Sequence, residues 1–433
     1  MRISLYRLYF PTWLLLAITL ISLPVRPGAT PDLTPLQFRE DFDLLWKTID
    51  EDYAYFDRQT TDWQKARDVF RPECSTIQTR AEFVTLLERL LDQLCDFHTQ
   101  LNTNTDVSQR LIPSGVNVWA EMRQGHAIIS EVRPGSPAAR SCLQPGDEIV
   151  AINGAPMAKA IASRFGPAMR TVSDTVREYI LMCLLAGRHD QQVTVEVIGS
   201  DRQARHAIVA EPDALPSPPS QATAPLEAHL LPGNIGYIRL HNSLGDSATI
   251  SAFDAAIEQL KVTSGLLLDL RDTPGGGNTT VARGIMGRLT RRELPYQKHV
   301  YPAEEKQTGI RHAWLELVSP RGRFTYTQPV VVLVDHWTGS MGEGIAIGLD
   351  GMRRATVVGT RMAGLLGAKY SVTLPNTHIV ASYGAEKVYH LYGTPREQYR
   401  PVIEVDLTLG RNKSLPDAIL TRGLARLKQE RAR

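Results

Sequence analysis

The chain has almost no excess of charge of either sign: 48 Lys and Arg residues stand against 46 Asp and Glu residues, a net charge of +2 at pH 7. Proteins that bind nucleic acid or an anionic membrane surface through charge concentrate one sign, so this balance indicates neither kind of partner. Hydrophobic residues make up 43% of the 433 residues, which is enough for buried cores in about three domains.

Cysteine is scarce, with four residues, Cys74, Cys95, Cys142 and Cys183. No Cys-x-x-Cys pair and no His-rich spacing suggests zinc ligation, so we expect no metal site, and no motif calls for a cofactor. An even count allows two disulfides in an oxidising compartment. The local pairing Cys74–Cys95 with Cys142–Cys183 is one expectation, and four buried free thiols are the other.

Long apolar runs are missing except near the N-terminus. Arg2 and Arg7 precede an apolar block over 13–23, and prolines and small residues follow up to Ala29. A membrane span needs about 20 apolar residues, and this block is shorter. The pattern predicts a signal peptide over 1–29 and export to the bacterial periplasm or the medium, with only transient membrane contact. An uncleaved anchor is the alternative.

Periodicity and composition divide the remaining chain into four regions. Over 30–105 apolar residues recur every three or four positions, which predicts a helical domain. Short strand signals follow over 106–211, and residues 212–225 are rich in Pro, Ser and Ala, as in a linker. From 226 to 433 strands alternate with helices, which predicts βαβ units and a largely parallel sheet.

The stretch 328–350 has the composition of a nucleophile turn. Residues 330–334 form a continuous apolar run typical of a strand buried on both faces, and a helical pattern starts at Met341. Ser340 lies between them, where unpaired N–H groups of a helix N-terminus face any anion that forms, as acyl transfer requires. An ordinary N-cap is the alternative, since Thr338 replaces the first glycine of a Gly-x-Ser-x-Gly elbow.

A second glycine-rich turn, at 275–277, follows the strand signal at 265–272. Its glycines allow the backbone to approach a substrate carbonyl closely. No Lys-Ser/Thr follows, so a phosphate-binding P-loop is disfavoured. Both turns lie at the carboxyl ends of predicted parallel strands, where such sheets bind ligands.

Residues 134–154 contain Pro-Gly-Ser-Pro-Ala and then Leu-x-Pro-Gly-Asp-x-Ile-x-x-Ile-Asn-Gly, and region 106–211 therefore resembles a PDZ domain. PDZ domains bind extended peptides, often free C-termini, by adding a strand to a sheet edge. The resemblance implies a polypeptide partner whose C-terminal segment is read by this domain. A domain that serves only as a spacer or gate is the alternative.

The chain resembles the C-terminal processing (tail-specific) serine peptidases in the order of its regions and in two motifs. These are Leu-Asp-Leu-Arg-Asp-x-Pro-Gly-Gly at 268–276 and Asp-x-x-x-Gly-Ser-Met-Gly-Glu at 335–343. The resemblance implies a multidomain protein: an N-terminal helical cap, a PDZ-like β-rich domain and a ClpP/crotonase-like α/β catalytic core. One catalytic design of the family is a Ser–Lys dyad. Leu365 stands at the place of that lysine, and Lys369 lies in the next predicted strand.

The family's other design, that of the tricorn protease core, uses Ser, His and Glu. Its His lies just before the PDZ domain, within a Leu-x-Asp-x-His-Ser/Thr motif. Residues 94–99 match this motif. The resemblance therefore implies that His98 is the general base for Ser340. It also implies a Glu near the C-terminus, for which we expect Glu397, with Glu404 as the alternate.

Two further features of the site follow from the resemblance. The family's assisting Ser precedes its His, but Phe97 stands there, and Thr99 is the possible substitute. The backbone N–H groups of Gly275, Gly276 and Met341 are the expected oxyanion hole, whose donors stabilise charge that develops on the substrate carbonyl oxygen.

This set of residues is chemically coherent. A Ser hydroxyl needs a base within hydrogen-bond reach, and an imidazole with a pKa of about 6.5 can take and return its proton. The resemblance implies an exported serine endopeptidase that cleaves unfolded or C-terminally exposed polypeptides. One alternative is a catalytically inactive protein that binds peptides or apolar ligands on the same scaffold. Another is an esterase or amidase acting on small substrates.

Overall fold

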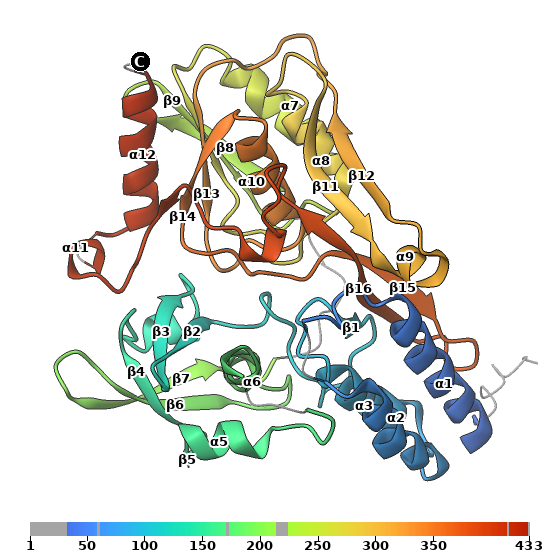
Figure 1. Ribbon diagram of the computed structural model, residues 1–433. Coiled ribbons are helices and arrows are strands. Elements are labelled where there is room, and N and C mark those ends of the chain that lie inside the picture. The colour runs from blue at the N-terminus through green and yellow to red at the C-terminus, as the bar shows by residue number, and fades with distance from the viewer. Residues whose placement is uncertain (1–32, 59–60, 170–172, 214–223, 414, 432–433) are drawn as a thin grey trace, which may run out of the picture. The chain divides into compact units, whose positions relative to one another are not determined.

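The computed structural model describes residues 33–431 apart from 59–60, 170–172, 214–223 and 414 (Figure 1). The predicted signal peptide over 1–29 lies outside the described residues, as does most of the predicted linker. In the part that is described, no helix is both long and apolar enough to cross a membrane.

The N-terminal region is helical, as the sequence predicts. Two of its helices begin with capping boxes, in which the side chain and backbone of Thr34 or Thr79 bond reciprocally with the third helical residue. Their apolar faces form one buried core, which also takes in side chains from strand β16 (Val380–Tyr389) of the C-terminal region, residues 226–431. The elements are α1 (Pro35–Asp52), α2 (Trp63–Phe70), the 3₁₀ helix η1 (Arg71–Ser75) and α3 (Arg80–Asp92).

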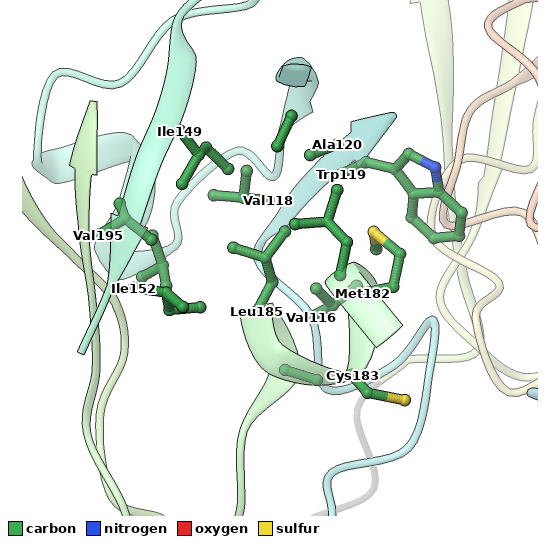
Figure 2. Close-up of a cluster of buried hydrophobic side chains, with 14 of the residues drawn as sticks. Val116, Val118, Trp119, Ala120, Ile149, Ile152, Met182, Cys183, Leu185 and Val195 are labelled. Atoms are coloured by element: carbon green, nitrogen blue, oxygen red, sulfur yellow. The ribbon is translucent and has the colours of Figure 1, made fainter. Parts of the chain in front are cut away.

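The PDZ-like region is an antiparallel sheet with strand order β2-β3-β4-β6-β7. Its core, drawn in Figure 2, packs Val118, Ile149 and Val195 of the strands against Met182 and Leu185 of helix α6. Strand β2 is an edge of this sheet, and α6 packs beside it. The strands are β2 (Val118–Arg123), β3 (His126–Val132), β4 (Glu148–Ile152), β5 (Ala155–Pro156), β6 (Val193–Ile198) and β7 (Ala204–Ala210); the helices are α4 (Pro137–Arg140), α5 (Met157–Ser163) and α6 (Asp174–Ala186).

The C-terminal region contains the predicted parallel sheet, with strand order β17-β14-β13-β10-β9-β8. All neighbouring strands are parallel except β8 and β9. Helices α7, α8 and α10 contribute to the core on one face, and α12 contributes to the core on the other. The elements are β8 (Leu226–Leu231), β9 (Ile235–Leu240), α7 (Ala248–Gln259), β10 (Leu266–Asp269), α8 (Thr279–Met286), β13 (Val330–Val334), α10 (Met341–Gly351), β14 (Ala355–Gly359), β17 (Ile403–Glu404), α11 (Gly410–Lys413) and α12 (Ala418–Arg431).

The C-terminal region also contains a second sheet, which joins segments that are far apart in the chain. The sequence patterns did not predict this sheet. Strand β1 follows directly after His98 and pairs antiparallel with β16, with Gln100 opposite Ser382. This pairing brings the end of the helical region to the C-terminal region. The elements are β1 (Gln100–Leu101), β11 (Leu294–Tyr301), α9 (Pro302–Thr308), β12 (His312–Val318), β15 (Ala368–Thr373), β16 (Val380–Tyr389) and the 3₁₀ helix η2 (Arg396–Gln398).

All four cysteines are free thiols, so the local disulfide pairing is wrong. The physical reason is that the partners lie in different surroundings. Cys74 is buried in the helical core and Cys183 in the PDZ-like core (Figure 2), whereas Cys142 is exposed. Burial raises the pKa of the Cys74 thiol to about 11 and that of Cys183 to about 12, so both stay protonated at neutral pH.

Candidate active site

Ser340 lies at the N-cap of α10, immediately after the turn that follows β13. Its backbone has φ 49° and ψ −107°, a region that residues with a Cβ rarely occupy and that costs about 1–3 kcal/mol. The N–H of Ser340 donates to Glu343 Oε2 over 2.8 Å, which holds the serine in this conformation. Strain at a turn of this kind is typical of functional positions.

His98 lies beside the serine hydroxyl. Its Nε2 is 3.1 Å from Ser340 Oγ, and its Nδ1 is 2.7 Å from the carbonyl oxygen of Leu366. A carbonyl oxygen can only accept, so Nδ1 carries the proton and Nε2 presents its lone pair to the hydroxyl. This is the tautomer that a general base requires.

The turn that carries His98 is held by Asp96, which is buried. The carboxylate accepts the backbone N–H of His98 over 2.8 Å and the hydroxyls of Thr99 over 2.7 Å and Tyr53 over 3.1 Å. Thr99, the possible substitute for an assisting serine, therefore donates to Asp96. Phe97 stacks on Tyr179 of α6, with ring centroids 4.8 Å apart.

Burial controls the charge of the His98 imidazole, which is 4% exposed. Desolvation, helped by the positive charges of Arg396 and Lys369, lowers the pKa of His98 to about 3. A base with such a pKa is neutral throughout the ordinary pH range, so it is ready to accept a proton but does not titrate near pH 7.

The structure does not place either predicted carboxylate on the His98 ring, which corrects that expectation. Glu397 forms an ion pair with Arg58, in the segment that follows α1, and Glu404 pairs with Arg400 at the surface. The reason lies in the 3₁₀ helix η2, which carries both Glu397 and Arg396. Glu397 is held by Arg58, whereas Arg396 donates to carbonyl oxygens next to the His98 ring. The position expected for the acid is occupied by the Leu366 carbonyl.

Glu343 is the site residue that the sequence analysis missed. It is fully buried, and its carboxylate accepts N–H groups from Ser340 over 2.8 Å, Gly364 over 2.9 Å and Leu365 over 3.3 Å. A Glu three residues after a helix N-cap is the mark of a capping box, and that signal was present in Gly-Ser-Met-Gly-Glu.

The three predicted oxyanion donors differ in their present partners. The N–H of Gly275 donates to Asn242 Oδ1 over 2.6 Å, and that of Gly276 donates to the Thr273 carbonyl over 3.2 Å. Gly276 has φ +62°, and a Cβ there would lie 2.4 Å from Ser340 Cβ. The N–H of Met341, the first residue of α10, has no acceptor among the described residues, so it is the donor that is free to meet a substrate oxygen.

The PDZ-like region contacts the nucleophile turn directly. Trp337 Nε1 donates to the Val116 carbonyl over 2.9 Å, and His336 Nδ1 is 2.6 Å from Glu131 Oε2 of β3. A cavity of about 600 Å³ lies beside these contacts, with Trp337, Glu131 and Arg133 in its lining. No group of three or more His, Cys, Asp or Glu side chains within the described ranges is arranged to hold a metal ion.

Known proteins match each region of the chain. Residues 234–405 match peptidase family S41, residues 34–92 match the tricorn protease C1 domain, and residues 105–177 match the PDZ domain. The chain therefore contains a serine peptidase domain of family S41. The carboxyl-terminal-processing protease of Synechocystis sp. is 25% identical over 370 residues, which span 81% of this chain and 77% of the relative.

Two solved structures share the fold of this peptidase. The structure of mature CPAF complexed with lactacystin has a TM-score of 0.56 at 15% identity, over 92% of this chain and 98% of that chain. The photosystem II D1 C-terminal processing protease has a TM-score of 0.52 at 20% identity, over 90% and 96% of the two chains. The helical, PDZ-like and catalytic regions of this chain therefore share the fold of these two proteins.

Proposed function

We propose that this S41 peptidase is an exported endopeptidase in which Ser340 is the nucleophile and His98 is its general base. The observation that carries the proposal is the 3.1 Å separation of Ser340 Oγ and His98 Nε2, with Nδ1 bonded to a carbonyl oxygen. A serine hydroxyl that is hydrogen-bonded to an oriented, neutral imidazole is the arrangement that acyl transfer needs.

The reaction follows from this geometry. Ser340 Oγ attacks the scissile carbonyl carbon while its proton moves to His98 Nε2, and the imidazolium then protonates the leaving amine. Water, deprotonated by the same nitrogen, hydrolyses the acyl-enzyme and restores the serine. The free N–H of Met341 stabilises the tetrahedral oxyanion. Losing such a donor costs about 3 kcal/mol of transition-state stabilisation.

The other predicted donors enter the reaction differently. Gly275 and Gly276 would have to exchange their present acceptors, Asn242 and Thr273, for the substrate oxygen.

Glu397 has no part in the proposed reaction because it pairs with Arg58. The imidazolium is stabilised instead by the Leu366 carbonyl, which accepts from Nδ1 in both charge states of the ring.

The substrate class we propose is an unfolded or C-terminally exposed polypeptide. The relatives are named for processing carboxyl termini, and strand β2 lies at an edge of the PDZ-like sheet, where an extended peptide can add as a strand. The cavity lined by Glu131 of β3 and by Trp337 lies next to the PDZ-like region, and Ser340, His98 and Met341 are not part of its lining. Export is supported by the basic and apolar pattern of residues 1–29.

Labelling with a fluorophosphonate probe and peptide mapping tests the assignment. We expect a covalent adduct on Ser340 in the wild type and none in Ser340→Ala or His98→Ala. Ser251→Ala and His206→Ala are matched controls, because both residues are exposed and lie outside the site, and they should label like the wild type. Folded wild-type protein that neither labels nor cleaves fluorescein-casein would contradict the proposal.

A further inference from the structure

Glu343 is a buried carboxylate to which the proposed reaction gives no part. Oε1 accepts the N–H of Gly364, and Oε2 accepts the N–H groups of Ser340 and Leu365. Three donors from two separate segments of the chain therefore meet on one side chain. Removing the carboxylate would leave buried N–H groups without acceptors, on the nucleophile and on the loop opposite it.

The loop 364–367, which we call the clamped loop, is also held through its carbonyl groups. Arg396, which is 2% exposed, donates from Nη2 to the carbonyls of Leu365, over 3.0 Å, and Gly367. The carbonyl between these two belongs to Leu366 and accepts from His98 Nδ1. Arg396 Nε is 3.9 Å from Glu343 Oε2, so the two charges compensate each other where they are buried.

We propose that Glu343 and Arg396 are positioning residues that set the separation between Ser340 and His98 by acting through the clamped loop. The proposal rests on the function proposed above. One carboxylate fixes the backbone of the nucleophile and the N–H side of the loop, and the loop carbonyl fixes the base. Neither residue touches the reacting atoms. A displacement of about 1 Å between such groups is enough to cost about 10²-fold in rate.

The positioning role requires an ionised Glu343. A protonated carboxyl would present an O–H within a set of three N–H donors, and one of its hydrogen bonds would be lost. Burial raises the pKa of Glu343 to about 7, against the opposing effect of the Arg396 charge. The rate should therefore fall as the pH drops through about 7. His98 does not produce this decrease, because its pKa is lowered to about 3.

Two buried carboxyls near the site have pKa values raised by burial, Glu343 and Asp96, which holds the turn of His98. The loss of the acid decrease in Glu343→Gln, and not the decrease alone, therefore identifies Glu343 as its source. Arg396 of η2 is the cation that acts on the carboxylate. Of the other elements packed on α10, β14 has no titratable residue, α8 carries Arg283, and η2 also carries Glu397, which pairs with Arg58. Strand β11 carries Tyr296, Lys298, Tyr301 and His299, and His299 is held between Glu316 and Glu386. Arg283 pairs with Glu316 of β12, and in the described part of the chain none of these side chains hydrogen-bonds to Ser340 or to the clamped loop.

The test compares Glu343→Gln with wild type in fluorophosphonate inactivation and in turnover of fluorescein-casein, from about pH 5 to about pH 9. Glu82→Gln is the matched control: Glu82 is also the third residue of a helix, accepts the N–H groups of Gln78 and Thr79, and is exposed far from the site. We expect kcat of Glu343→Gln to fall about 10²-fold at pH 8, with KM within about twofold, and its decrease near pH 7 to disappear.

Each outcome decides between the two proposals. If Glu343→Gln keeps the kcat and the acid decrease of a wild type that labels on Ser340, the positioning role is wrong and the proposed function stands. If folded wild type does not label, the proposed function itself fails. Should Glu343→Gln not fold, as judged by circular dichroism, Arg396→Lys replaces it. This variant keeps a cation, but its ammonium lies on a side chain without the planar fork of arginine and cannot reproduce the positions of both Nε and Nη2. We therefore expect about a tenfold loss of kcat with the acid decrease retained, and an unchanged kcat would refute the proposal.

Discussion

At the scale of single residues, the site depends on backbone geometry as much as on side chains. Ser340 has a positive φ, and Gly276 approaches it so closely that no side chain fits between them. Because a helix N-terminus lies next to this contact, the free N–H of Met341 and the hydroxyl of Ser340 face the same small space. Glycine at position 276 is therefore a requirement of the site and does not merely give the loop freedom.

Replacing Gly276 with Ala should abolish activity. The new Cβ would lie 2.4 Å from Ser340 Cβ and 3.2 Å from the N of Met341, so the serine or the loop must move. We expect at least about a 10²-fold loss in the rate of fluorophosphonate labelling. Gly125→Ala is the control, because Gly125 also has a positive φ but has no atom within 4 Å of a new Cβ. Equal labelling of the two variants would show that the contact of residue 276 with Ser340 does not limit the rate.

At the scale of elements, the sequence predicted what is local and missed what joins distant segments. The predicted strand over 330–334 has the same bounds as β13, because a continuous β-branched run fits only a strand covered on both faces. The antiparallel sheet of β1, β16, β11 and β12 was not predicted, since β11 has a mixed polar composition and β16 lies far along the chain from both β1 and β11. The place of His98 depends on this sheet, and only the family motif indicated it.

The acidic residues of the site, Glu343 and Glu397, also owe their places to contacts between distant segments. Glu343 reads locally as a helix cap, and its second role becomes visible only when residues 364 and 365 fold against it. Glu397 matched its expected place along the chain, but its direction is set by η2 and by the Arg58 cation. The spacing of the sequence therefore located the turn of Ser340. Tertiary contacts decide which carboxylate, Glu343 or Glu397, supports the site.

Glu397→Gln should therefore affect stability more than catalysis. The pair of Glu397 with Arg58 ties η2 to the segment after α1, and Arg58 is partly exposed, so we expect a loss of about 1 kcal/mol in the free energy of unfolding. The rate of Ser340 labelling should change less than about threefold, because no bond joins Glu397 to His98. Urea unfolding and labelling rates measure the two effects. A large loss of kcat with unchanged stability would restore Glu397 as the carboxylate partner of His98.

At the scale of the whole molecule, the site is assembled from all three regions. His98 follows the helical region, Ser340 belongs to the catalytic sheet, and the PDZ-like strand β3 holds the turn between β13 and α10 through Glu131 and His336. Trp119 of β2 stacks on the same imidazole, with ring centroids 4.9 Å apart. Movement of the PDZ-like region would therefore act on the nucleophile turn without any intermediate element.

His336 should make the stability of the molecule depend on pH. Burial disfavours its charge, but the carboxylates of Glu121, 3.9 Å from Nε2, and of Glu131, hydrogen-bonded to Nδ1 over 2.6 Å, raise its pKa to about 9. A pKa raised above the unfolded value of about 6.5 gives stability that is complete below pH 6.5 and is lost as the pH rises through about 9. We expect wild type to lose at most about 3 kcal/mol over this interval relative to His336→Gln. Thermal unfolding at pH 6 and pH 9 measures the difference, with the exposed His206→Gln as the control. If His336→Gln and wild type lose stability in parallel, the ring is neutral in the folded protein, and the contact between the PDZ-like region and the nucleophile turn does not depend on its charge.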